Sequence, residues 1–361
     1  MGSKLMIREK KDGANRMFQP DMQYLLDCFR RIVETPSPVG FYTLLNPVLE
    51  REAAQLGCAV TYDRRGTPYI TLEGQDDSKT VLVGAHSDTV GFVVRRIDAN
   101  GMLRVRQLGG INYASCEGET VTVHTRDGRQ YTGIFACQSH SVHVFDDAKT
   151  LVRDENTCVV ILDEPVRSKA EVNALGIFNG DFVSVEPRMQ VTPNGYLKSR
   201  FIDDKAAVAC VFTMVKYLKD NGLKPKYRTL LAFPYTEEIG FGGTYVPEEV
   251  SEYIAVDIGL IGPDYDGDEY KVSICAKDNA APYDYDLTNR LIGYAKKAGC
   301  DYAVDVFYRY GTDGNASVRA GNDLRAAAFG MAVYCSHGME RTHLTGLNNT
   351  VNLLLGYILD I

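Results

Sequence analysis

Two histidines and five acidic residues follow short apolar stretches of the sequence, at points where a buried strand would end. They are His86, Asp88, Asp203, Glu237, Glu238, Asp257 and His337. Imidazole nitrogens and carboxylate oxygens are ligands that zinc, cobalt and manganese accept in proteins. The set therefore predicts a site for a pair of divalent ions, such as Zn, Co or Mn.

Asp203 and Asp204 are adjacent where a strand-like stretch gives way to an apolar helical one. Neighbouring carboxylates repel each other, and a helix N-terminus supplies only about half a charge to offset them. For an isolated pair, the simpler interpretation is a helix cap at Asp203 with Asp204 in the first turn. A carboxylate shared by two ions roughly 3.5–4 Å apart would remove the repulsion, and the other candidate ligands favour this interpretation.

The elements that must position these residues can be predicted from the apolar runs. Residues 80–84 predict a strand buried on both faces, which delivers His86 and Asp88 at its carboxyl end. Strands at 228–233 and 253–257 precede Glu237, Glu238 and Asp257 in the same way. Ligands in open parallel sheets bind beyond the carboxyl ends of the strands.

The remaining periodicity completes an α/β fold with a mixed, largely parallel sheet flanked by helices. Helices are expected over 21–34, 43–56, from 203 onward, 284–298 and 348–360, with strands over 302–308 and 326–334 and a turn at 311–314. Between them, residues 96–194 are strand-rich and punctuated by glycine, which predicts a smaller β-barrel-like domain inserted into the first. The catalytic α/β domain would then comprise residues 1–95 and 195–361.

Composition limits the class of protein. The chain has 361 residues, is 45% hydrophobic and 24% charged, and carries a net charge of −8, which argues against a nucleic-acid or anionic-membrane partner. There is no run long enough for a membrane span and no hydrophobic signal core, and the nine cysteines are scattered without a CxxC pair. We therefore expect reduced thiols and a cytoplasmic location.

Four segments resemble the motifs of the cytosolic tetrahedral aminopeptidases, the group of glutamyl, leucyl and deblocking metallo-aminopeptidases. The segments are HSDTVGFVVRRIDANGMLRVRQLGG from residue 86, FIDDKAAVAC from 201, PYTEEIGFGG from 234 and YGTDGNA from 310. The resemblance runs from about residue 21 to the C-terminus and keeps the order of the motifs. It implies a zinc-exopeptidase type of fold for the α/β domain.

The resemblance also implies roles for the candidate residues. His86 and Asp257 would bind one metal, Glu238 and His337 the other, and Asp203 would bridge them. Glu237 would be the general base, and Asp88 would fix the tautomer and orientation of His86. The family usually has a cis peptide after the bridging residue, here Asp203-Asp204. Thr312 and Asp313 of the GTD turn would line the substrate pocket.

Other histidines compete for the ligand role. The last family motif usually reads Y-x-H-S-P-x-E, whereas residues 334–343 read YCSHGMERTH. His343 is therefore an alternative to His337. We favour His337 because it directly follows a predicted strand. His140 and His143 form an H-x-x-H pair in the inserted domain, but no base or bridging carboxylate accompanies them.

The activity that the resemblance implies is removal of the N-terminal residue from short peptides, by a water activated by two metals with Glu237 as base. Alternatives are a deacylase or carboxypeptidase-type amidohydrolase on the same scaffold, and a glycoside hydrolase using Glu237 and Glu238. The glycoside hydrolase is disfavoured because adjacent residues at a strand end should point to opposite sides. The resemblance also implies that the inserted domain builds homodimers that join into dodecamers.

Overall fold

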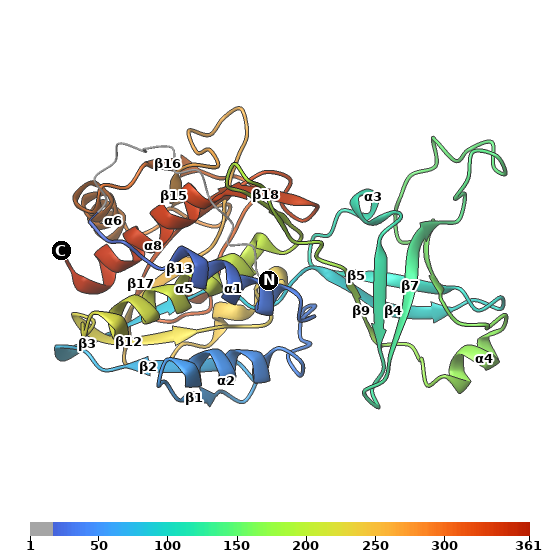
Figure 1. Ribbon diagram of the computed structural model, residues 1–361, viewed down its shortest axis with the longest axis horizontal. Helices are drawn as coiled ribbons and strands as arrows, with labels where there is room; N and C mark the ends of the chain where they lie inside the picture. The colour runs from blue at the N-terminus through green and yellow to red at the C-terminus, as the bar shows by residue number, and fades with distance from the viewer. Residues whose placement is uncertain (1–16) are drawn as a thin grey trace.

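The computed structural model describes residues 17–361, in which an α/β domain carries a β-barrel at one side (Figure 1). The main sheet of the α/β domain has nine strands, in the order β1-β2-β12-β3-β13-β17-β15-β16 with β14 beside β17. The pairs β12–β3, β3–β13, β13–β17, β14–β17 and β15–β16 are parallel, and the others are antiparallel. The expected mixed, largely parallel sheet is confirmed. Its strands are β1 (Val60–Tyr62), β2 (Pro68–Leu72), β3 (Asp76–Gly84), β12 (Tyr227–Ala232), β13 (Val250–Val256), β14 (Gly259–Leu260), β15 (Val272–Lys277), β16 (Tyr302–Val306) and β17 (Arg325–Val333).

The central strands are buried on both faces, as an apolar run without alternation predicts. In β3, Val81 and Val83 belong to one hydrophobic core and Leu82 to another. Side chains alternate along a strand, so the two cores lie on opposite faces of the sheet. The larger core includes side chains of three helices beside the sheet, in which α5 (Ile202–Asp220) packs against both α1 (Met22–Val33) and α8 (Leu344–Leu359).

The helices begin and end close to the expected positions, with two differences. The closing helix begins at Leu344 rather than at residue 348. Residues 311–314 are not an isolated turn, because a helix begins at Asp313. Thr312 caps this helix by accepting from the backbone N–H of Gly314 at 3.1 Å. The helices are α1 (Met22–Val33), α2 (Asn46–Gln55), α3 (Tyr113–Cys116), α4 (Lys169–Ala174), α5 (Ile202–Asp220), α6 (Tyr285–Ala298), α7 (Asp313–Arg319) and α8 (Leu344–Leu359). None of those within residues 17–361 combines the length and apolarity needed to cross a membrane.

Six strands of the inserted segment close into a barrel, in the order β4-β5-β8-β7-β6-β9. Its first strand begins at Gly91, before the boundary expected at residue 96. Phe92 and Phe135 stack in its interior with ring centroids 4.8 Å apart. The barrel strands are β4 (Gly91–Ile97), β5 (Leu103–Leu108), β6 (Thr120–His124), β7 (Gln130–Cys137), β8 (Cys158–Leu162) and β9 (Phe182–Val185).

A small sheet pairs the segment that leaves the barrel with a strand near the C-terminus of the chain. Its strands are β10 (Gln190–Val191), β11 (Tyr196–Ser199) and β18 (Glu340–His343), and β11 lies between the other two. β11 leads into Asp203, and β18 follows His337. Two distant parts of the chain that carry candidate ligands are therefore aligned by one pair of strands.

Candidate metal centre

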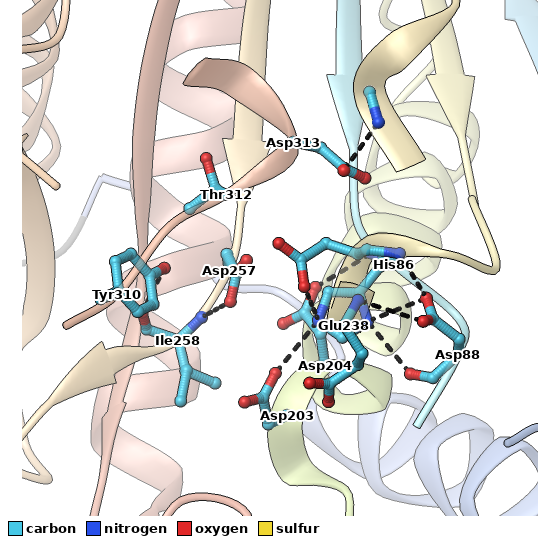
Figure 2. Close-up of polar contacts among 12 residues, drawn as sticks. His86, Asp88, Asp203, Asp204, Glu238, Asp257, Ile258, Tyr310, Thr312 and Asp313 are labelled. Carbon is cyan, nitrogen blue, oxygen red and sulfur yellow. Dashed lines mark hydrogen bonds and ion pairs between the residues drawn. The ribbon is translucent and has the colours of Figure 1, made fainter. Parts of the chain in front are cut away.

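Four neighbouring parallel strands deliver most of the candidate ligands to one edge of the main sheet. In the order β12-β3-β13-β17, their carboxyl ends are followed by Glu237 and Glu238, His86, Asp257 and His337. Parallel strands end at the same edge, so residues far apart in sequence converge there. Asp203, at the N-terminal end of α5, lies against the same edge (Figure 2).

Asp203 contacts both histidines with separate oxygens. Its Oδ1 lies 3.1 Å from His86 Nε2, and its Oδ2 lies 3.5 Å from His337 Nε2. His337 Nε2 is also 3.1 Å from Glu238 Oε2. A carboxylate with one oxygen directed at each imidazole is in the position of a bridge between two ions.

Donor atoms gather in two groups that share His86. Atoms of His86, Asp203 and Glu238 lie within 4.8 Å of one another, and so do atoms of His86, Asp204 and Asp257. Asp204 was not predicted as a ligand, although its adjacency to Asp203 was a signal. The peptide bond between Asp203 and Asp204 is cis, as the resemblance implied. Asp203 does not act as the helix cap that the simpler interpretation predicted, since its two carboxylate oxygens are directed at His86 and His337 rather than at backbone N–H groups of the helix.

Asp88 is fully buried and supports several parts of the site at once. Its backbone carbonyl lies 3.0 Å from His86 Nδ1, closer than its carboxylate at 3.4 Å. The two carboxylate oxygens accept from the backbone N–H groups of Glu237 and Glu238, each at 3.2 Å. Asp88 thus orients His86 mainly through its carbonyl and holds the acidic pair through its side chain.

The ring of His337 is oriented by the barrel. Its Nδ1 lies 3.1 Å from the carbonyl oxygen of Gly110, in the loop after β5. If Nδ1 donates to this carbonyl, Nε2 keeps its lone pair and faces Asp203 and Glu238. His343 lies elsewhere, with Nε2 2.8 Å from the carbonyl of Asn194 and its ring against Tyr270.

The charges at this edge are unbalanced. Burial raises the pKa of Asp257 to about 8, with a further contribution from Asp203, and burial also raises the pKa of Glu237. Burial acts in the same direction on Asp203, but its contacts with His337 and His86 outweigh it and hold its pKa below the ordinary value. Carboxylates without enough cations are costly to bury.

Of the buried carboxylate oxygens that lack a hydrogen-bond partner within the described part of the chain, two lie at this edge of the sheet, Asp204 Oδ1 and Glu238 Oε1. Bound cations would coordinate these two unpaired oxygens and would offset the surplus negative charge around them. The nitrogen and oxygen donors of this site therefore fit divalent ions.

A cavity of about 780 Å³ opens beside the candidate ligands. Asp203, Glu237, Glu238 and Asp257 line it together with Thr312. Asp313 instead accepts from Gly243 N at 2.7 Å. Glu237 and Glu238 begin a short 3-10 helix (Glu237–Ile239) and face the same cavity, so the expectation that they point to opposite sides is wrong.

His140 and His143 are exposed on the barrel and belong to neither group of donor atoms found in residues 17–361. Sequence reasoning missed the contributions of Asp204 and the Gly110 carbonyl, and it considered Glu340 only as part of an altered motif. Glu340 is buried and accepts from the backbone N–H of Asp203 at 2.9 Å and of His337 at 3.0 Å. Its place in the family motif was the available signal.

Replacing Gly110 by Ala should reduce turnover about 10–100-fold, the usual cost of disturbing a group that orients a metal ligand. A Cβ at this position would lie 2.9 Å from His337 Nδ1, so the imidazole would have to move. Steady-state kinetics and the metal content of the variant measure the effect. Gly293→Ala is the control, since its Cβ would meet no atom within 4 Å; equal losses in both variants would contradict the role of Gly110.

The sequence matches the M42 glutamyl aminopeptidase family over residues 66–353. It is 37% identical over 335 residues to the Bacillus subtilis (strain 168) protein named "Putative aminopeptidase YhfE", covering 92% of this chain and 96% of that protein. The fold is similar to a TET aminopeptidase from the marine sediment archaeon Thaumarchaeota archaeon SCGC AB-539-E09, with a TM-score of 0.83, 18% identity and coverage of 94% and 97%.

The fold is also similar to the Pyrococcus horikoshii TET1 peptidase, with a TM-score of 0.82 and 23% identity over 93% of this chain and 100% of that one. The structural matches extend through both the α/β domain and the barrel, and the family match includes every candidate ligand. The resemblance inferred from the motifs is confirmed. The chain belongs to the M42 glutamyl aminopeptidase family of peptide-hydrolysing enzymes.

Proposed function

We propose that this protein is a two-metal aminopeptidase that removes the N-terminal residue from short peptides. The observation that carries the proposal is the position of Asp203, which directs one oxygen at each of two histidines at the edge of a cavity lined by Glu237 and Glu238. His86 and Asp257 would hold one ion, Glu238 and His337 the other, and Asp203 both. Zinc, cobalt and manganese suit this donor set, and Asp204 is a further donor beside His86 and Asp257.

When bound, the two ions would polarise the scissile carbonyl and make a water more acidic. Glu237 would accept the proton of that water and later deliver it to the leaving amine. Its position supports this role, because the side chain lines the cavity and Oε2 lies 3.7 Å from His86 Nε2. Burial raises its pKa, which makes the carboxylate a stronger base.

Recognition of the substrate's N-terminus would rest on charge. The two ions would offset the charge of Asp203, Glu238 and Asp257, so the attraction for an ammonium group would come from Glu237, which lines the cavity and is not a proposed ligand. An N-acylated peptide carries no such charge, so it would lose this attraction. The same feature disfavours a deacylase or a carboxypeptidase, whose substrates place an acyl group or a carboxylate in the site.

Comparing a peptide that has a free amino terminus with the same peptide after N-acetylation tests the proposal. We expect kcat/KM for the free peptide to exceed that for the acetylated peptide by at least about tenfold, equivalent to about 1.4 kcal/mol. Mass spectrometry of the products measures which bond is cut. Preferential hydrolysis of the acetylated peptide, or release of C-terminal residues, would favour the alternative amidohydrolases.

The barrel would serve assembly into dimers and then a dodecamer. In support, the similar TET1 peptidase is described as assembling into a tetrahedron or a large octahedral shell. The barrel also exposes apolar side chains, with Val142, Val144 and Val152 exposed by 56%, 66% and 69%. Light scattering of the active enzyme tests this assignment, and an active monomer would contradict it.

A cytoplasmic location is also proposed, in keeping with nine free cysteines.

A further inference from the structure

Glu340 connects the two turns that carry Asp203 and His337. Its side chain is only 2% exposed, and its two oxygens accept from two different backbone N–H groups, Oε2 from Asp203 at 2.9 Å and Oε1 from His337 at 3.0 Å. No Lys, Arg or His side chain within residues 17–361 forms an ion pair with it. Both oxygens are therefore committed to holding the backbone of two proposed ligands.

Each of these turns contains a residue in the left-handed region. Phe201, two residues before Asp203, has φ 63°, and His337 itself has φ 62°. A left-handed residue other than glycine costs about 1–2 kcal/mol, so such a turn persists only when its surroundings stabilise it. A buried carboxylate that accepts from both turns supplies such stabilisation, because hydrogen bonds to a charged acceptor are stronger than those between neutral groups.

The neighbouring strands bring Glu340 to this position. In the β11–β18 ladder, Glu340 is opposite Ser199, four residues before Asp203. The backbone pairing sets the spacing of the strands, but it ends before either ligand is reached. The side chain of Glu340 continues the connection beyond the end of the ladder.

We infer that Glu340 is a positioning residue that holds Asp203 and His337 in the arrangement in which they bind the same divalent ion. It contacts these ligands through their backbones and does not line the cavity. The present distance between Asp203 Oδ2 and His337 Nε2 is 3.5 Å, and it depends on the relative placement of the two turns. The inference rests on the proposed two-metal site.

Glu340→Gln is the direct test, because it keeps the shape of the side chain but replaces one acceptor oxygen by an NH₂ donor. One of the two backbone N–H groups would then face another donor. We expect one ion to bind about 10–100-fold more weakly than in the wild type. Competition between the metal-free protein and a chromophoric chelator for added Zn²⁺ measures the affinity, and thermal unfolding of the metal-free proteins reports their stability.

Glu269→Gln is the matched control. Glu269 is also a buried carboxylate beside β18, but it pairs with Arg341 at 2.6 Å and contacts no proposed ligand. We expect this variant to bind both ions as the wild type does. Equal affinity losses in the two variants, or wild-type affinity in Glu340→Gln, would overturn the inference.

Glu340→Asp covers the case in which Glu340→Gln does not fold. The shorter side chain keeps the charge but cannot reach both turns, so a folded Glu340→Asp should also bind one ion at least about tenfold more weakly. Wild-type affinity in this variant, or failure of both variants to fold, would overturn the positioning role. If the wild type binds no Zn²⁺, the proposed function fails as well. If the wild type binds two ions and the Glu340 variants bind them with the same affinity, only the positioning role of Glu340 is rejected.

Discussion

Replacing Glu237 by Gln should reduce turnover about 10²–10⁴-fold while both ions remain bound. Glutamine keeps the shape of the side chain and removes its basicity, so the variant cannot take a proton from water. In the proposed assignment Glu237 binds no ion, although its Oε2 lies 3.7 Å from His86 Nε2. The measurements are kcat and the metal content of the purified variant.

Glu238→Gln provides the matched comparison, since the two residues are neighbours in the same 3-10 helix. Glu238 Oε2 lies 3.1 Å from His337 Nε2, and an amide oxygen is a poorer ligand than a carboxylate, so this variant should lose one ion. Loss of an ion from Glu237→Gln but not from Glu238→Gln would show that base and ligand are exchanged. Near-normal turnover in both variants would place the reaction elsewhere.

Removing the metals should abolish peptide hydrolysis, because without them nothing polarises the scissile carbonyl or makes a water acidic. The surplus of carboxylates around Asp203 predicts that the metal-free protein is also less stable, since the ions offset their repulsion. Activity and thermal unfolding after chelation, compared with a dialysed control, measure both effects. Full activity in exhaustively chelated enzyme would contradict the metal-dependent reaction.

The fold was largely predictable because the strongest local signals belong to buried elements. The apolar run before His86 predicted β3, and the same reasoning placed β12, β13 and β17 before the other candidate ligands. Since these four strands are parallel neighbours, their carboxyl ends coincide. The convergence of His86, Glu238, Asp257 and His337 follows from that topology.

Features of the site that depend on local backbone conformation could not be predicted from the sequence pattern. Asp204 is a candidate donor because the backbone after Phe201 is not helical at Asp203 and Asp204. The helical periodicity of the sequence predicts only an ordinary first-turn residue at Asp204. The expectation that Glu237 and Glu238 diverge assumed a strand, whereas they begin a 3-10 helix. The Gly110 carbonyl is a backbone group, so no residue type marks its contact with His337.

Titration of the metal-free enzyme with Zn²⁺, followed simultaneously by calorimetry and by hydrolysis of an aminoacyl anilide, tests the two-metal account most directly. Asp203 contacts both histidines, so the account predicts two bound ions per chain and full activity only when the second site fills. Saturation of activity at one ion per chain, or binding of two ions without any hydrolysis of a free N-terminal residue, would contradict it.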